Sequence, residues 1–155
     1  MCGIVGYIGY RQAGPVCTSG LLSLEYRGYD SFGIATLSPA LSLCKHLGKI
    51  SDAKTSANHL EGQIGIGHTR WATHGVPSEI NAHPHVDRNK KIAVVHNGII
   101  ENYAELKRGL EERGVVFASQ TDTEVIPHLI AEKYTGDLLA AVTAILPILK
   151  DSYAL

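Results

Sequence analysis

A cysteine stands directly behind the initiator methionine. Once Met1 is removed, the thiol of Cys2 and a free α-amino group belong to the same residue. An α-amino group has a reference pKa of about 7.7–8.0, near the pH at which a general base works best. Cys2 is therefore a candidate nucleophile that carries its own base. The alternative is a small apolar residue that opens a strand, because free cysteines are usually buried and inert.

Asn97-Gly98 follows directly after the apolar segment 91–96. Asn-Gly is the strongest short signal for a type I′ hairpin turn. The chain from Ile99 onward runs into a helical pattern, however, which argues against a returning strand. A side-chain amide N–H and a glycine N–H can instead point at one developing oxyanion. The pair is therefore also a candidate oxyanion hole.

The segment 69–75 (TRWATHG) groups several side chains that bind small molecules. Arg70 can bind a carboxylate through two parallel hydrogen bonds. Thr73 and His74 add hydrogen-bonding groups, and Trp71 is suited to form a wall or lid. The alternative is an ordinary surface loop with a solvated arginine.

Asp122 lies in the segment 121–124 (TDTE), which has the pattern of a capping box before an apolar helix. That pattern explains an acidic residue here without any ligand. A carboxylate just outside a helix could also hold an ammonium group. Arg70 and Asp122 together would then bind the two ends of an amino acid's zwitterionic head.

The histidines invite a metal interpretation, since imidazole is a common ligand. The ones concerned are His68, His74, His83, His85 and His96. Their spacing matches no standard zinc pattern, and no acidic or cysteine ligands converge nearby. We expect structural or hydrogen-bonding histidines, no metal and no cofactor. No phosphate-binding glycine loop of a common type is present either.

Hydrophobic periodicity predicts the elements that must position these residues. Strands are expected at 3–8, 32–37, 41–47, 63–68 and 91–96, with short ones at 115–118 and from 152. Helices are expected at 14–27, 101–113, 125–134 and 137–149, with a weak one within 48–62. Residues 69–87 form a polar stretch of a length that usually marks a functional or disordered loop.

Size and composition are those of one globular domain, with 155 residues, 45% of them hydrophobic and 19% charged. A net charge of −1 favours neither a nucleic acid nor an anionic membrane as partner. No apolar run has the length of a membrane span, and no signal peptide is recognised. The three cysteines form no disulfide framework, which points to the cytoplasm. Cys17 and Cys44 lie in apolar segments and are expected in the core.

Six segments carry a resemblance to a known family. They are MCGIVGYIG at 1–9, LEYRGYDS at 24–31, GHTRWATHG at 67–75, NAHPH at 81–85, VHNGIIENY at 95–103 and TDTEVI at 121–126. The chain resembles the class II glutamine amidotransferases, a branch of the N-terminal-nucleophile hydrolases. LEYRGYDS and HTRWATHG favour the aminosugar-forming glutamine–fructose-6-phosphate aminotransferases over the purine-pathway and asparagine-forming branches.

The resemblance assigns catalytic roles to residues near the nucleophile. It implies that Cys2 is the nucleophile, freed by removal of Met1. It implies that Asn97 and Gly98 form the oxyanion hole. Arg27 and Gly28 are expected close to the nucleophile, with Arg27 helping to position it.

The resemblance also assigns the glutamine-binding residues. Arg70 is expected to bind the α-carboxylate, and Thr73 and His74 to line the same pocket. Trp71 is expected in a loop near the ammonia exit. Asp122 is expected to bind the α-ammonium group.

The implied fold is α+β, a four-layer αββα sandwich of two mainly antiparallel sheets with helices outside. Residues 1–155 would be the N-terminal part of a glutaminase domain, incomplete at the C-terminus and without the family's sugar-binding isomerase domain. The implied reaction converts L-glutamine to glutamate and ammonia through a γ-glutamyl thioester on the cysteine. In a full-length homo-oligomeric enzyme the ammonia would convert fructose 6-phosphate to glucosamine 6-phosphate. The alternatives are a truncated module that at most binds glutamine, and the glutaminase half of a purine-pathway amidotransferase.

Overall fold

The computed structural model describes residues 2–150 and 152–155. These residues contain a four-stranded antiparallel sheet with the strand order β1-β4-β2-β3. Its strands are β1 (Gly3–Ile8), β2 (Ser31–Leu37), β3 (Leu41–Leu47) and β4 (Ile64–Arg70). The register places Gly3 opposite Thr69. This pairing brings Cys2 to the end of β4, where Arg70 lies.

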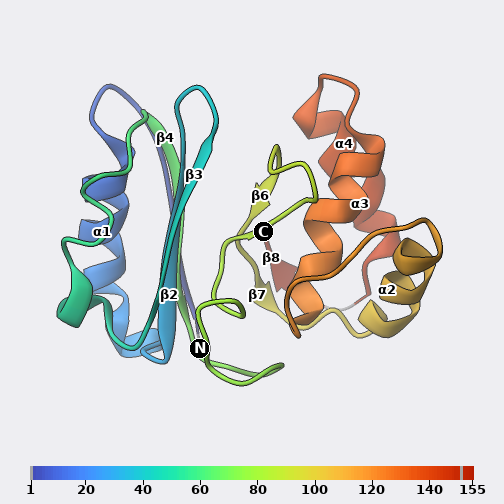
Figure 1. Cartoon of the computed structure of the whole chain (residues 1–155), viewed down its shortest axis with the longest axis horizontal. Helices are drawn as coiled ribbons and strands as arrows, with labels where there is room; N and C mark the ends of the chain where they lie inside the picture. Colours follow the sequence, from blue (N-terminus) through green and yellow to red (C-terminus); the bar gives the residue numbers. More distant parts are fainter. Residues whose placement is uncertain (1, 151) are drawn as a thin grey trace.

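Helix α1 (Ala13–Ser23) covers one face of this sheet (Figure 1). A hydrophobic core lies between them, built from Cys17, Leu21, Phe32, Ile34, Ile50, Ala57 and Leu60. Two glycines of β4 allow the close approach, because a Cβ at Gly65 would lie 2.8 Å from the Cβ of Ala13 and one at Gly67 would lie 3.0 Å from Leu21. Burial raises the pKa of the Cys17 thiol to about 11, so this cysteine is a packing residue.

Two short ladders lie on the other side of the sheet, opposite α1 (Figure 1). One pairs β5 (His85–Val86) with β6 (Ala93–Val94), and the other pairs β7 (Asn97–Gly98) with β8 (Tyr153–Ala154). Beyond them lie the helices α2 (Tyr103–Glu112), α3 (Val125–Lys133) and α4 (Leu138–Ile145). Short 3₁₀ helices are η1 (Glu25–Arg27), η2 (Ile50–Ala53), η3 (Asp122–Glu124) and η4 (Leu146–Ile148). The described residues form no helix long and apolar enough to cross a bilayer.

The second hydrophobic core lies among these helices and the short strands. It includes Ile92, Val94, Ile100, Leu110, Val125, Ile126, Leu129, Ile130, Ala141, Ile145 and Leu149. Between this core and the sheet lies a buried polar layer that contains His68, His83, His85 and His96. Buried polar groups need hydrogen-bond partners, so this layer constrains the side chains beside it.

The strands of the large sheet were predicted almost to the residue, whereas the segment 91–96 was not. Only Ala93–Val94 is strand there. Asp87 explains the difference, because its Oδ1 accepts from the N–H groups of Lys91 and Ile92 at 2.7 Å each. A side chain thus takes donors that a longer ladder would use. Asn97-Gly98 is not a hairpin turn, since it pairs with Tyr153 and Ala154, where a strand was expected.

The helices depart from prediction mainly at their ends. The first helix ends at Ser23 and is followed by the separate turn η1. The last ends at Ile145 and continues only as a 3₁₀ turn that contains Pro147. Asp137 caps this last helix by accepting from the Ala140 N–H at 3.0 Å. The weak helix expected within 48–62 is limited to the 3₁₀ turn η2.

The predicted capping box at 121–124 is wrong. Thr121 makes no side-chain hydrogen bond to the following turn, and its Oγ1 instead lies 3.0 Å from His85 Nε2. Glu124 accepts from the N–H groups of Ala118 and Ser119 at 2.8 and 2.6 Å. The short strand expected at 115–118 does not form, and the Ala118 N–H of that segment is bonded to Glu124.

Candidate active site

A cleft of about 390 Å³ opens where β4 ends, beside the segments that begin at Trp71 and at His96. Among the described residues, it is lined by Cys2, Arg27, His68, Arg70, Trp71, Thr73, His74, His83, His96, Asn97, Gly98, Ile99, Thr121, Asp122 and Thr123. Every residue predicted for the site lines it, except Gly28. Residues from widely separated parts of the sequence therefore share one cavity.

Cys2 is held at the cleft by three parts of the fold. Its Sγ accepts a hydrogen bond from the Trp71 N–H at 3.2 Å. Its carbonyl accepts from Asn97 Nδ2 at 3.2 Å and from Arg27 Nε at 3.3 Å. The next residue, Gly3, donates its N–H to the Thr69 hydroxyl at 3.2 Å. The thiol is half-buried, so it remains open to the cleft.

Asn97 and Gly98 face Cys2 from the short strand β7. The amide oxygen of Asn97 lies 2.9 Å from His68 Nε2, and its amide nitrogen donates toward Cys2. Gly98 has a φ of +132°, and a Cβ there would lie 2.7 Å from the Ser152 carbonyl oxygen. The backbone at this position therefore requires glycine.

Arg70 ends β4 as a cation that is only 4% exposed. Its Nη2 donates to the carbonyl oxygens of His74 and Gly75. Its Nη1 has no hydrogen-bond partner within residues 2–150 and 152–155. Burial lowers the pKa of this guanidinium, while nearby Asp30 and Asp122 oppose the shift. A buried cationic N–H that lines a cleft is a natural site for an anion.

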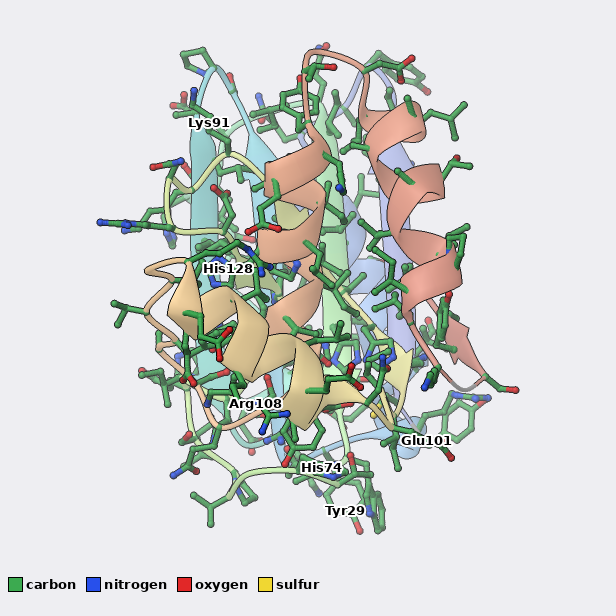
Figure 2. The ribbon with its side chains drawn as sticks, turned by 90° about the vertical axis from the view of Figure 1, so that its right-hand side faces the viewer. Tyr29, His74, Lys91, Glu101, Arg108 and His128 are labelled. Carbon is green, nitrogen blue, oxygen red and sulfur yellow. The ribbon has the colours of Figure 1, made fainter. Side chains whose placement is uncertain are left out.

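The loop after Arg70 is anchored by a residue that the sequence analysis missed. Asp30 accepts a hydrogen bond from the Ala72 N–H through one carboxylate oxygen and from the Ser31 hydroxyl through the other. Trp71 is 48% exposed and packs edge-on against Tyr29, with ring centroids 5.1 Å apart. Figure 2 shows Tyr29 and His74 at the same end of the molecule.

The remaining predicted residues lie around this loop. Thr73 is exposed at the cleft, and the His74 ring packs against Tyr103 at 5.6 Å. Gly28 lies behind the cleft, because a Cβ there would come within 2.8 Å of the Arg70 carbonyl carbon. Gly28 therefore sets the position of the Arg70 backbone, and a side chain there would displace it.

Asp122 lies in η3 and is 3% exposed. Its Oδ2 accepts from the Ile100 N–H at 2.8 Å. The carboxylate thus joins the segment after Gly98 to the start of α3. It lines the same cleft as Arg70, so the two predicted binding groups for an amino-acid head occur together.

The buried histidines form a cluster of rings, of which His68, His83 and His96 line the cleft. The rings of His68 and His83 are 4.1 Å apart, and those of His83 and His85 are 4.8 Å apart. Burial lowers the pKa of His68 to about 4 and that of His85 to about 3. These rings are therefore neutral near pH 7. Among the described residues, no three or more His, Cys, Asp or Glu side chains are grouped so that they could hold a metal.

The chain matches the family model described as the glutamine amidotransferase domain over residues 36–145. It therefore belongs to the glutamine amidotransferase family, in the class II branch that the opening cysteine indicated. Two solved structures share the fold. Glutamine phosphoribosylpyrophosphate amidotransferase from B. subtilis, complexed with ADP and GMP, has a TM-score of 0.82 at 30% identity, over 99% of this chain and 34% of its own. A structure described as the allosteric regulatory enzyme of purine biosynthesis has a TM-score of 0.85 at 31% identity, with the same coverage.

Particular curated relatives are more similar in sequence. Glutamine–fructose-6-phosphate aminotransferase (isomerizing) from Symbiobacterium thermophilum is 58% identical over 158 residues, which cover 100% of this chain and 26% of the relative. The protein of the same name from Pyrococcus horikoshii is 58% identical over 160 residues, which cover 100% of this chain and 27% of the relative. The chain thus spans about a quarter of the length of these relatives. The α+β class of the fold is confirmed by the structural matches.

Proposed function

We propose that this chain hydrolyses L-glutamine to glutamate and ammonia through a γ-glutamyl thioester on Cys2. The observation that carries the proposal is that one cleft holds the Cys2 thiol, the Asp122 carboxylate and the Nη1 of Arg70, which has no partner among the residues that the structure describes. These groups have the chemistry to bind an amino-acid head and to attack a carbonyl beyond it. The family to which the chain belongs supports the same assignment.

Glutamine would bind with its α-carboxylate on Arg70 and its α-ammonium group on Asp122. Thr73 and His74 would line the space around the carboxylate, and Trp71 would cover the ammonia exit. The side-chain amide would then extend toward Cys2. Fixing both ends of the head in this way holds the reacting carbonyl near the thiol, which lowers the entropic part of the barrier.

The reaction begins after removal of Met1. The Cys2 thiol gives its proton to its own α-amine through a water molecule, and the thiolate attacks the amide carbon of glutamine. The N–H groups of Asn97 and Gly98 stabilise the tetrahedral oxyanion, each contributing about 2.7–4 kcal/mol. The protonated amine then gives its proton to the leaving nitrogen, and ammonia departs. Water attacks the thioester, releases glutamate and restores the thiol.

We further propose that this domain serves a longer aminosugar-forming protein, in which the ammonia converts fructose 6-phosphate to glucosamine 6-phosphate. An identity of 58% to the aminosugar-forming relatives supports this branch over the purine-pathway structures at 30 and 31%. In this proposal the sugar is bound outside these 155 residues, and the longer protein is a cytoplasmic homo-oligomer. We also infer that the sheet, the two ladders and the helices are part of an αββα sandwich.

Cys2→Ala tests the nucleophile, in protein whose intact mass shows that Met1 has been removed. The wild-type chain should release glutamate from glutamine, and Cys2→Ala should release none above background. Retained Met1 should abolish activity equally, because the amine is then no longer on the cysteine. Glutamate release by Cys2→Ala at the wild-type rate would overturn the assignment. Calorimetric binding of glutamine to a wild-type chain that shows no hydrolysis would instead identify a non-catalytic binding module.

A further inference from the structure

His68 is a fully buried residue of β4 that sequence reasoning assigned to no catalytic role. Its Nε2 lies 3.1 Å from the carbonyl oxygen of His96 and 2.9 Å from the amide oxygen of Asn97. A backbone carbonyl can only accept a hydrogen bond, so Nε2 must carry a proton. The same N–H then also faces the side chain of Asn97.

The N–H at Nε2 of the neutral ring determines which way the Asn97 amide points. The side of the amide that faces His68 must be its oxygen, because an NH₂ group there would meet another N–H. The NH₂ group therefore faces the other way, where it donates to the Cys2 carbonyl at 3.2 Å. That carbonyl selects the same orientation independently, since an amide oxygen placed against it would be repelled.

The surroundings of His68 keep the ring neutral. Burial lowers its pKa to about 4, although the hydrogen bonds to Asn97 and to the His96 carbonyl act in the opposite direction, and repulsion from the His96 ring and Arg70 adds to the lowering. His83 stacks on the ring at 4.1 Å, and His85 lies behind His83. Within the part of the chain that the structure describes, Nδ1 has no hydrogen-bond partner. The single proton of the ring is therefore on Nε2 across the neutral pH range.

We propose that His68 is a positioning residue, which holds the amide oxygen of Asn97 so that the NH₂ group faces the oxyanion formed at Cys2. The inference rests on the proposed glutaminase function. Without His68 only the Cys2 carbonyl orients the amide, so for part of the time it would rotate and present its oxygen to the developing negative charge. Loss of one oxyanion donor lowers kcat by about 10²–10³-fold, so a partly misdirected amide should lower it by a smaller factor.

The kinetic test compares His68→Leu with His68→Gln. His68→Leu removes the donor and should lower kcat for glutamine hydrolysis by about 10–100-fold. KM should stay within about threefold, because Arg70 and Asp122 still bind the substrate. His68→Gln places an amide N–H near the position of Nε2 and should recover most of the lost kcat. Circular dichroism confirms that each variant is folded before it is assayed.

A double-mutant cycle with Asn97→Ala separates positioning from general destabilisation. If His68 acts through Asn97, His68→Leu should lower kcat little further when Asn97 is already alanine. His128→Leu is the matched control, because it also removes a buried imidazole, from α3. It should leave kcat within about twofold of the wild type. The proposal would be overturned if His68→Leu lowered kcat as much in the Asn97→Ala background as in the wild type. An equally large fall in kcat from His128→Leu would also overturn it.

A measurement independent of activity completes the test. Imidazole ¹⁵N NMR should show His68 with its proton on Nε2 and no titration between about pH 5 and 8. The side-chain NH₂ of Asn97 should exchange with solvent faster in His68→Leu than in the wild type. A proton on Nδ1, or a titration near pH 6.5, would contradict the proposal. A wild-type chain that releases no glutamate would instead count against the proposed function, while the NMR result still decides the role of His68.

Discussion

Arg70 combines two properties that rarely occur together in a side chain with a purely structural role. It is buried, and its Nη1 has no partner among residues 2–150 and 152–155 although Nη2 is well bonded to the loop carbonyls. The bonded half fixes the position of the guanidinium, and the unbonded half lines the cleft. A buried N–H without a partner is unfavourable unless a ligand completes it, which supports the proposed contact of Arg70 with the substrate carboxylate.

Arg70→Lys should raise KM for glutamine by about 10–100-fold, which corresponds to about 1.4–2.8 kcal/mol of binding free energy. A lysine cannot bond the loop carbonyls and a carboxylate in the same planar geometry. Steady-state glutamate release against glutamine concentration measures the change. Arg108→Lys, at an exposed position of α2 labelled in Figure 2, is the control and should match the wild type. An unaltered KM in Arg70→Lys would remove the arginine from the binding site.

Single residues of the site differ in how far the sequence could predict them. Cys2, Asn97 and Gly98 stand in short motifs whose chemistry is local, and they do share a cleft. Asp30 and His68 act through partners that are 42 and 29 residues away. No local pattern marks such contacts, since they arise from the β2–β4 pairing and from the approach of residues 96–97 to β4.

At the scale of elements, β2 must approach the histidine segment very closely. A Cβ at Gly33 would lie 2.1 Å from the carbonyl oxygen of His83. The absence of a side chain there lets the segment with His83 lie flat on the sheet, beside His68. The polar layer and the cleft therefore depend on a strand position without a side chain.

Gly33→Ala should lower the free energy of unfolding by more than about 2 kcal/mol, because backbone must move to relieve the clash. Gly6→Ala is the matched control on β1, where an added Cβ meets nothing within 4 Å. It should change the stability by less than about 1 kcal/mol. Urea unfolding followed by circular dichroism compares the two variants. Equal effects would show that the approach of the His83 segment does not limit stability.

Elements also differ in how well the sequence predicts them. The strands of the large sheet have long apolar patterns that tertiary contacts reinforce. Segment 91–96 has an equally apolar pattern, yet Asp87 takes two of its N–H groups. The Thr121 and Glu124 side chains bond to His85 and Ser119 and do not form a capping box. In each case a polar side chain forms hydrogen bonds that differ from those of the predicted element. Which groups it bonds depends on the tertiary structure around it, which the local sequence pattern does not contain.

At the scale of the whole molecule, the buried histidines couple stability to pH. The pKa of His68 is about 4 and that of His85 about 3 in the folded chain, against about 6.5 in an unfolded chain. Below pH 6.5 the unfolded chain therefore binds protons that the folded chain does not. The stabilisation is fully present above pH 6.5 and is lost as the pH falls toward the folded pKa values.

The free energy of unfolding should accordingly fall by up to about 1.4 kcal/mol per pH unit for each of these histidines as the pH drops below about 6.5. Urea unfolding at about pH 7, 6 and 5 measures this slope. His85→Gln should reduce the slope, since the glutamine side chain does not titrate. A wild-type stability that stays constant from pH 7 to 5 would show that these histidines are not held neutral.

A second cleft of about 300 Å³ lies between the large sheet and helices α3 and α4. Its lining is largely apolar and includes Leu37, Ile64, Ile66, Val94, Ile130, Leu138, Val142 and Leu155. Lys91, which also lines it, lies at the opposite end of the molecule from His74 in Figure 2. Apolar surface that is open to water favours association.

The chain should therefore self-associate as its concentration rises. Sedimentation velocity over a range of concentrations measures this, and Leu138→Glu should shift the distribution toward the monomer. Leu138 is suitable because it lines the cleft and is half-exposed. A wild-type chain that sediments as a monomer at every concentration and melts cooperatively would contradict the expectation.

The ladder between β7 and β8 joins Gly98 to Tyr153 and Asn97 to Ala154. Because the ladder has only these two pairs, a displacement of Tyr153 would act directly on the backbone of Asn97 and Gly98, the proposed oxyanion donors. The Tyr153 ring also lies 6.3 Å from that of His96, whose carbonyl faces His68. Under the proposed mechanism, a force applied at residues 152–155 would therefore move Asn97 and Gly98 and change the rate of glutamine hydrolysis at Cys2.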